Sequence, residues 1–79
     1  MSNLDLDIDE QMNQLESEWR QAYEASVIAR AEYQALTANP QTPLTELGAA
    51  AERLQRAETC KARIMVRIER LEESLLDSH

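Results

Sequence analysis

The chain has 79 residues and a formal net charge of −7, from 15 acidic and 8 basic side chains. This length allows one domain at most, and the acidic balance disfavours nucleic-acid binding because phosphate contacts need a cationic face. The single cysteine cannot form an internal disulfide, and no Cys and His residues have metal-ligand spacing. We therefore expect no metal, no cofactor and no nucleic-acid partner.

The short chain needs a source of stability beyond its own core. Below about 80 residues, one core rarely supplies more than about 3–5 kcal/mol without a disulfide, a metal or oligomerisation. Oligomerisation or partner binding is therefore expected. No apolar run is long enough for a membrane span, and the N-terminus lacks the features of a signal peptide, so we expect a cytoplasmic protein.

The N-terminal segment 1–6 alternates apolar and acidic residues, with no second strand in the chain to pair with it. We predict a flexible acidic tail there. Asp7 is expected to cap the first helix, because Glu10 follows three residues later as in a capping box. A helix that begins earlier, at Asn3 or Asp5, is the alternative.

The first helix is predicted over residues 7–37. From Ile8 onward the apolar residues recur in alternating steps of four and three, which is a heptad pattern and predicts one buried stripe, or seam. Ser26 is the polar member of this seam. The apolar members are Ile8, Met12, Leu15, Trp19, Ala22, Ala29, Tyr33 and Leu36.

A turn is predicted over residues 38–42, where the helical pattern stops. Pro40 disfavours a helical conformation at the residue before it. Thr42 followed by Pro43 is typical of an N-cap with proline at the first helical position, so the second helix is expected to begin at Pro43.

The second helix is predicted over residues 43–76, followed by a short tail at 77–79. It repeats the heptad spacing, with Lys61 as the polar member of its seam. The apolar members are Leu47, Ala50, Leu54, Ala57, Ile64, Ile68, Leu71 and Leu75. The fold predicted is all-α, an antiparallel two-helix coiled-coil hairpin that dimerises into a four-helix bundle.

The turn fixes the register of the two seams. It pairs Leu36 with Leu47 beside the turn and Ile8 with Leu75 at the open end, and every seam position between them finds a counterpart. Large residues mostly face small ones near the turn, and large face large toward the open end.

One flank of the seam carries most of the arginines, and we call it the arginine flank. Its residues are Arg53, Arg56, Arg63, Arg67 and Arg70. The register places Glu18 opposite Arg67 and Glu32 opposite Arg53, which predicts two ion pairs. An RNA-binding stripe is the alternative, but no aromatic residue interleaves with it for base stacking. Cys60 on this flank is predicted to be a partly buried structural thiol, and a redox or intermolecular disulfide role is the alternative.

The other flank carries surplus apolar residues and no complementary charge pairs in this register. We call it the apolar flank, and its residues are Tyr23, Val27, Ala51, Ala62, Met65 and Leu76. A two-helix layer leaves such residues in water, which indicates a second contact surface. Apolar residues scattered singly over the surface are the alternative, because these are common.

Lys61 is the one seam residue with candidate chemistry. Its stem can pack in the seam while its ammonium group lies over the Trp19 ring. A catalytic lysine is the alternative. The many carboxylates lie mostly on solvent faces, and a hairpin has no shielded cleft to separate their pKa values, so we expect neither an enzyme nor a small-molecule substrate.

The function predicted is a non-enzymatic protein–protein interaction module that forms a homodimer or docks on a partner helix. A small chaperone or regulator of one specific partner is the alternative, and an RNA-binding hairpin dimer is a further one. The architecture resembles that of short helical-hairpin chaperones of bacterial secretion systems, and that of hairpins that dimerise to bind RNA. No residue motif of either family occurs in the chain.

Overall fold

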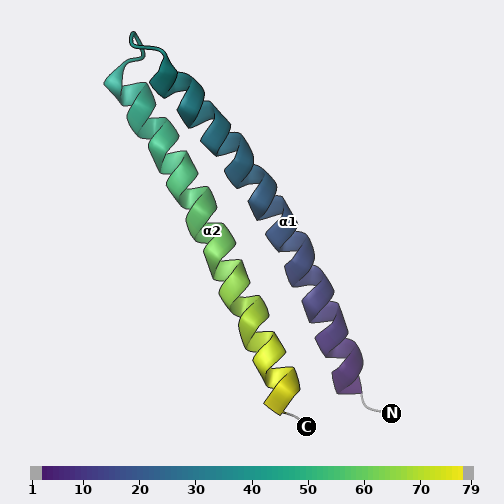
Figure 1. Cartoon of the computed structure of the whole chain (residues 1–79). Helices are drawn as coiled ribbons and strands as arrows, with labels where there is room; N and C mark the ends of the chain where they lie inside the picture. Colours follow the sequence, from purple (N-terminus) through teal and green to yellow (C-terminus); the bar gives the residue numbers. More distant parts are fainter. Residues whose placement is uncertain (1–2, 78–79) are drawn as a thin grey trace.

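The computed structural model describes residues 3–77, with side-chain surroundings from residue 7 onward. Two helices, α1 (Asn3–Ala38) and α2 (Leu44–Asp77), run side by side in opposite directions and are joined by one short loop (Figure 1). The molecule is a rod of 62 × 17 × 15 Å, one helix layer thick. The predicted all-α hairpin is confirmed.

The first helix begins earlier than the sequence pattern suggested. It starts at Asn3, four residues before the predicted start at Asp7, so the alternative start applies and the tail predicted over 1–6 is wrong for residues 3–6. Asp7 and Asp9 therefore lie in the second turn of α1 and not at its N-terminal end. The second helix extends to Asp77, one residue past its predicted end. The rest of the predicted tails, 1–2 and 78–79, lies outside the described residues.

The loop is a hydrogen-bonded turn organised by Asn39. Its carbonyl accepts a hydrogen bond from the Thr42 N–H at 3.1 Å, which closes a β-turn over Pro40 and Gln41. Its side-chain oxygen accepts a second bond from the Gln41 N–H at 3.0 Å. An asparagine that bonds its own backbone two residues on, followed by proline, is a strong turn signal.

Thr42 does not cap α2 as predicted. Its hydroxyl donates to the carbonyl of Leu36 at 2.8 Å, so it satisfies the end of α1 instead. The first bond of α2 runs from the Leu47 N–H to the Pro43 carbonyl at 3.1 Å, which makes Pro43 the residue just before the helix. The end of α1 has unpaired backbone carbonyls and the start of α2 has unpaired N–H groups. The folded loop places the Thr42 hydroxyl beside one of these carbonyls, that of Leu36.

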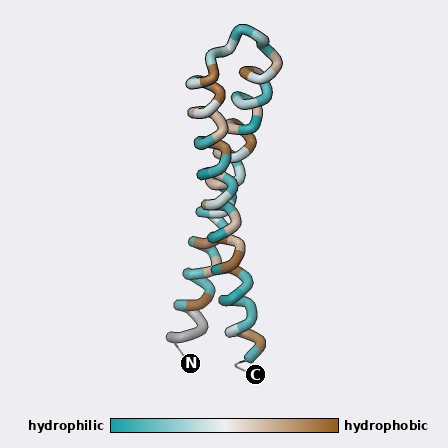
Figure 2. Tube along the Cα trace, turned by 90° about the vertical axis from the view of Figure 1, so that its left-hand side faces the viewer, coloured by the Kyte–Doolittle hydropathy of each residue, from teal (hydrophilic) through white to brown (hydrophobic). Residues whose placement is uncertain are grey.

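The seam residues lie between the helices. The most deeply buried are Leu15, Ala22, Ser26, Ala29, Ala50 and Ile64, and the remaining seam residues from Ile8 to Leu75 are half-buried. Figure 2 shows hydrophobic positions recurring along both helices among hydrophilic ones, with a hydrophilic loop. Leu15, Ala22 and Ile64 form the core cluster, and three larger half-buried side chains pack against it: Trp19, Ile68 and Leu71.

The core is thin. Among the described residues, no large side chain is less than 2% exposed. Two helices packed in one layer can cover only one stripe of each other, so each seam residue keeps an edge in water. This geometry leaves both flanks of the seam open along the whole rod.

Candidate functional site

The apolar flank is exposed along the rod. Tyr23 is 46% exposed, Val27 49%, Met65 38% and Leu76 74%. Ala62 is also exposed, whereas Ala51 is half-buried beside the seam. The side chains that the sequence analysis assigned to a contact surface therefore lie where a partner could reach them.

Leu44 extends this flank and was missed from the sequence. It is 84% exposed and lies seven residues before Ala51, at the same heptad position. The heptad spacing of α2 includes Leu44, which stands in the first turn directly after Pro43. Two other large apolar side chains, Ile28 and Val66, are exposed away from this flank.

A polar network crosses the middle of the apolar flank. Arg30 of α1 donates to Glu58 of α2 at 2.7 Å, and Lys61 lies 3.1 Å from the other oxygen of the same carboxylate. The expectation that this flank lacks charge complementarity is therefore wrong. Arg30 is not opposite Glu58 in the register; its long side chain spans the two turns, seven residues, that separate them along the rod.

Lys61 contacts Tyr23 and not Trp19 as predicted. Its Nζ lies 5.6 Å from the centroid of the Tyr23 ring. The two rings stack on each other, with centroids 5.3 Å apart and planes inclined by 20°. The ion pair with Glu58 holds the Lys61 ammonium group on the flank, where it lies over the Tyr23 ring.

Glu58 is the one titratable side chain here with a clear shift. Its pKa is lowered, first because Lys61 donates a hydrogen bond to it, and further because Lys61 and Arg30 are both positively charged. Partial desolvation acts in the opposite direction and is outweighed. The network is therefore charged at neutral pH and joins the two helices at the centre of the flank.

A shallow hollow accompanies this network. It is an open cavity of about 320 Å³. Tyr23 and Arg30 line it, together with the two polar seam residues Ser26 and Lys61. Ser26 donates its hydroxyl to the Tyr23 carbonyl at 2.7 Å, so this small seam residue has a local partner. The hollow is open to solvent and has no shielded acid–base pair of the kind that hydrolysis needs.

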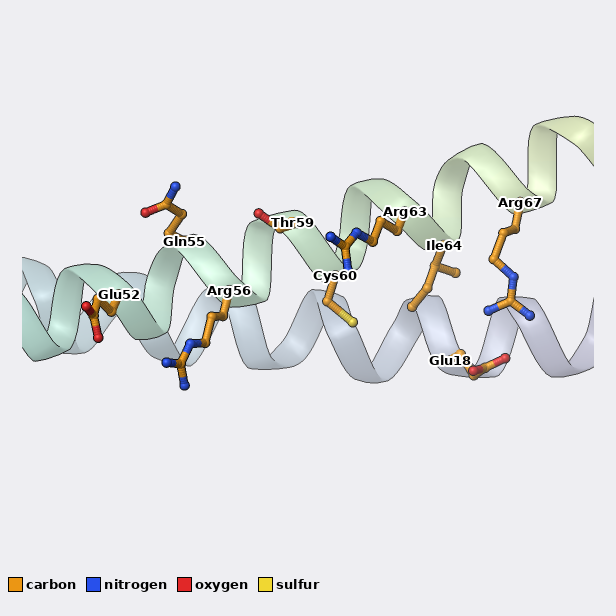
Figure 3. A pocket seen from close by; sticks show the side chains of 9 residues that line it. All are labelled: Glu18, Glu52, Gln55, Arg56, Thr59, Cys60, Arg63, Ile64 and Arg67. Atoms are coloured by element: carbon orange, nitrogen blue, oxygen red, sulfur yellow. The ribbon is translucent and has the colours of Figure 1, made fainter.

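The arginine flank carries a larger and more polar groove of about 660 Å³. In Figure 3 the Cys60 and Arg67 side chains point toward α1, whereas Gln55 and Thr59 point away from it. The groove is lined by Glu18, Glu52, Gln55, Arg56, Thr59, Cys60, Arg63, Ile64 and Arg67. No aromatic residue is among them, so the groove has no platform for stacking a base.

One of the two ion pairs predicted for the arginine flank forms. Arg53 Nε lies 3.5 Å from Glu32, as the register requires. Glu18 and Arg67 both line the groove but do not come within ion-pair distance of each other. Cys60 is exposed in this groove, so the prediction of a partly buried thiol is wrong.

Neither flank holds a metal site within residues 3–77, where no three His, Cys, Asp or Glu side chains gather. No helix in that range is long and apolar enough to cross a membrane. Comparisons with protein-family models, with curated proteins and with solved structures find no match to this chain.

Proposed function

We propose that the chain is a non-enzymatic protein–protein interaction module, which self-associates through its apolar flank into a four-helix bundle. The observation that carries this proposal is the exposure of Tyr23, Val27, Met65 and Leu76 on one flank of the seam. Apolar side chains aligned on one face of a short amphipathic hairpin mark a contact surface. A second copy of the chain is the simplest partner, because in a two-fold dimer the same surface patch of both copies forms the interface.

The thin core supports the same conclusion. No large side chain among the described residues is fully buried, and each helix has a neighbour on one side only. A second hairpin stacked on the apolar flank would cover the open edge of the seam and of the Trp19–Tyr23 stack. Burying apolar surface contributes about 25 cal/mol per Å², so closure would add stability that one layer lacks.

Sedimentation of charge-substituted variants tests the proposal. Wild-type chain should sediment at twice its mass of 9.0 kDa. The double variant Ala51→Glu/Ala62→Glu places two carboxylates inside the contact and should weaken the dimer at least about tenfold. The matched control is Ala35→Glu/Ala49→Glu, which adds the same charge at exposed positions on the opposite side of the seam and should leave the mass unchanged.

Two results would contradict the proposal. One is a wild-type chain that remains monomeric over the whole accessible concentration range. The other is equal loss of the dimer in both double variants, which would mean that net charge and not the apolar flank controls association.

A further inference from the structure

Charge is unevenly distributed along the apolar flank. The end remote from the loop is predominantly acidic there, with Asp9, Glu16, Glu69 and Glu72 outnumbering the single basic residue Arg20. The basic residues Arg30 and Lys61 lie in the middle, bound to Glu58. The end beside the loop is uncharged and apolar, with Leu44 and Ala51.

This distribution discriminates between the two ways in which a two-fold axis can stack one flank on another. With both loops at the same end, the four acidic residues of one copy would lie against the same four of the other. Like charges brought together at an interface repel each other and disfavour association. With the loops at opposite ends, each acidic end would lie over the apolar end and the central arginine of the other copy.

We propose that two hairpins stack antiparallel through their apolar flanks, with the two-fold axis level with Tyr23. The proposal rests on the self-association proposed above and specifies its geometry. In this arrangement α1 lies against α1 of the second copy, and α2 against α2.

The positions along α1 fit this axis. Glu16 and Arg30 lie seven residues to either side of Tyr23, which is one heptad, so all three share a face. The axis therefore brings Glu16 of one copy against Arg30 of the second, and the reverse, giving two ion pairs. Trp19 and Val27 lie four residues to either side, so they also meet across the axis, and Tyr23 meets its own equivalent.

The positions along α2 fit the same axis independently. The seam register, in which Leu36 pairs with Leu47, places Tyr23 level with Cys60 of α2. Leu44 and Leu76 lie sixteen residues to either side of Cys60. The axis chosen from α1 therefore sets Leu44 of one copy against Leu76 of the second. These are the most exposed leucines among residues 7–77, at 84% and 74%.

A distance between spin labels tests the direction of stacking. Gln41 in the loop is replaced by cysteine in a Cys60→Ser background, and the dimer is labelled with a nitroxide. Gln41 lies eighteen residues from Tyr23, so antiparallel stacking separates the two labels by about 50 Å at 1.5 Å per residue in each copy. Parallel stacking would hold them within about 20 Å, because packed helices lie about 8–10 Å apart.

A charge exchange tests the position of the axis. Glu16→Arg and Arg30→Glu should each weaken the dimer at least about tenfold, and the combined variant should recover to within about threefold of wild type, since both ion pairs re-form with reversed sign. Glu24→Arg, at an exposed position off this flank, is the control and should change the dimer little. Helicity of each variant is followed, because Arg30 also bonds Glu58 inside the hairpin.

The outcomes separate the two proposals. A monomeric wild-type chain overturns the proposed function together with this inference. A dimer with the short label distance overturns this inference and leaves self-association intact. A dimer with the long distance in which the exchanged variant fails to recover, although it remains helical, overturns the axis at Tyr23.

Discussion

The half of the seam beside the loop and the half toward the open end are built from different residues. In the loop half the buried positions are small, with Ser26 at 3%, Ala29 at 8% and Ala50 at 1% exposure. In the open half the core cluster combines the large Leu15 and Ile64 with the small Ala22. Small residues permit close approach of the backbones, whereas large residues bury more apolar surface.

Polar contacts between the helices follow the same division. Both interhelical ion pairs, Arg30 with Glu58 and Arg53 with Glu32, lie in the loop half of the described chain. The hydrogen bonds of the loop lie beside them. We infer that the loop half is aligned by polar contacts and chain connection, and that the open half, whose described residues form no interhelical ion pair, is held by apolar burial.

The largest expected effect is in the open half. Ile64→Ala removes the central side chain of the core cluster and should lower the free energy of unfolding by about 2–4 kcal/mol. Urea unfolding followed by far-UV circular dichroism, at one fixed chain concentration, measures it. Ile28→Ala is the matched control, because Ile28 is 60% exposed, and it should change the free energy by less than about 0.5 kcal/mol. Equal effects would mean that the open half is not a core.

The loop half should instead be sensitive to added volume. Ala29→Leu inserts three heavy atoms into a position that is 8% exposed and should destabilise by about 1–3 kcal/mol, because the backbones must separate. Ala31→Leu makes the same change at an exposed position of α1 and should be nearly neutral. A stabilising Ala29→Leu would show that the loop half is loosely packed, which would remove the contrast between the halves.

Thr42 tests the polar side of the comparison. Thr42→Val keeps the shape of the side chain but removes the hydroxyl that donates to Leu36, and should cost about 0.5–1.5 kcal/mol of unfolding free energy. Thr45→Val, at an exposed position in the first turn of α2, controls for the effect of a β-branched apolar residue. If the two variants are equally stable, the hydroxyl does not help to hold the end of α1.

The sequence predicted the fold and the stripe between the helices because both follow from backbone propensity and from spacing. Heptad spacing identified the residues that face the partner helix, and the loop between them set the register that Arg53 and Glu32 show. The same spacing also assigns Leu44, in the first turn of α2, to the exposed apolar flank.

The contacts that the sequence did not predict are made by flexible side chains with more than one possible partner within reach. Lys61 could lie over Trp19 or Tyr23, and the choice was made by Glu58, which holds its ammonium group. The Thr42 hydroxyl could hydrogen-bond to backbone groups at the end of either helix. The folded loop places it beside the Leu36 carbonyl at the end of α1. Spacing assigns a face, but it does not choose a rotamer or a hydrogen-bond partner.

The smallest expected effect concerns Glu58, and it tests whether polar contacts align the loop half. Its folded-state pKa lies below the ordinary value of 4.5, so the unfolded chain binds more protons at this site in acid. The stability that it contributes is therefore complete above that value and is lost as the pH falls through the lower folded-state pKa. Glu58→Gln should lower the thermal midpoint at neutral pH, and the difference from wild type should shrink toward zero in acid. The other carboxylates titrate in both proteins, so the difference isolates this one. A difference that stays constant with pH would show that the variant lost packing and not the charge that holds Arg30 and Lys61.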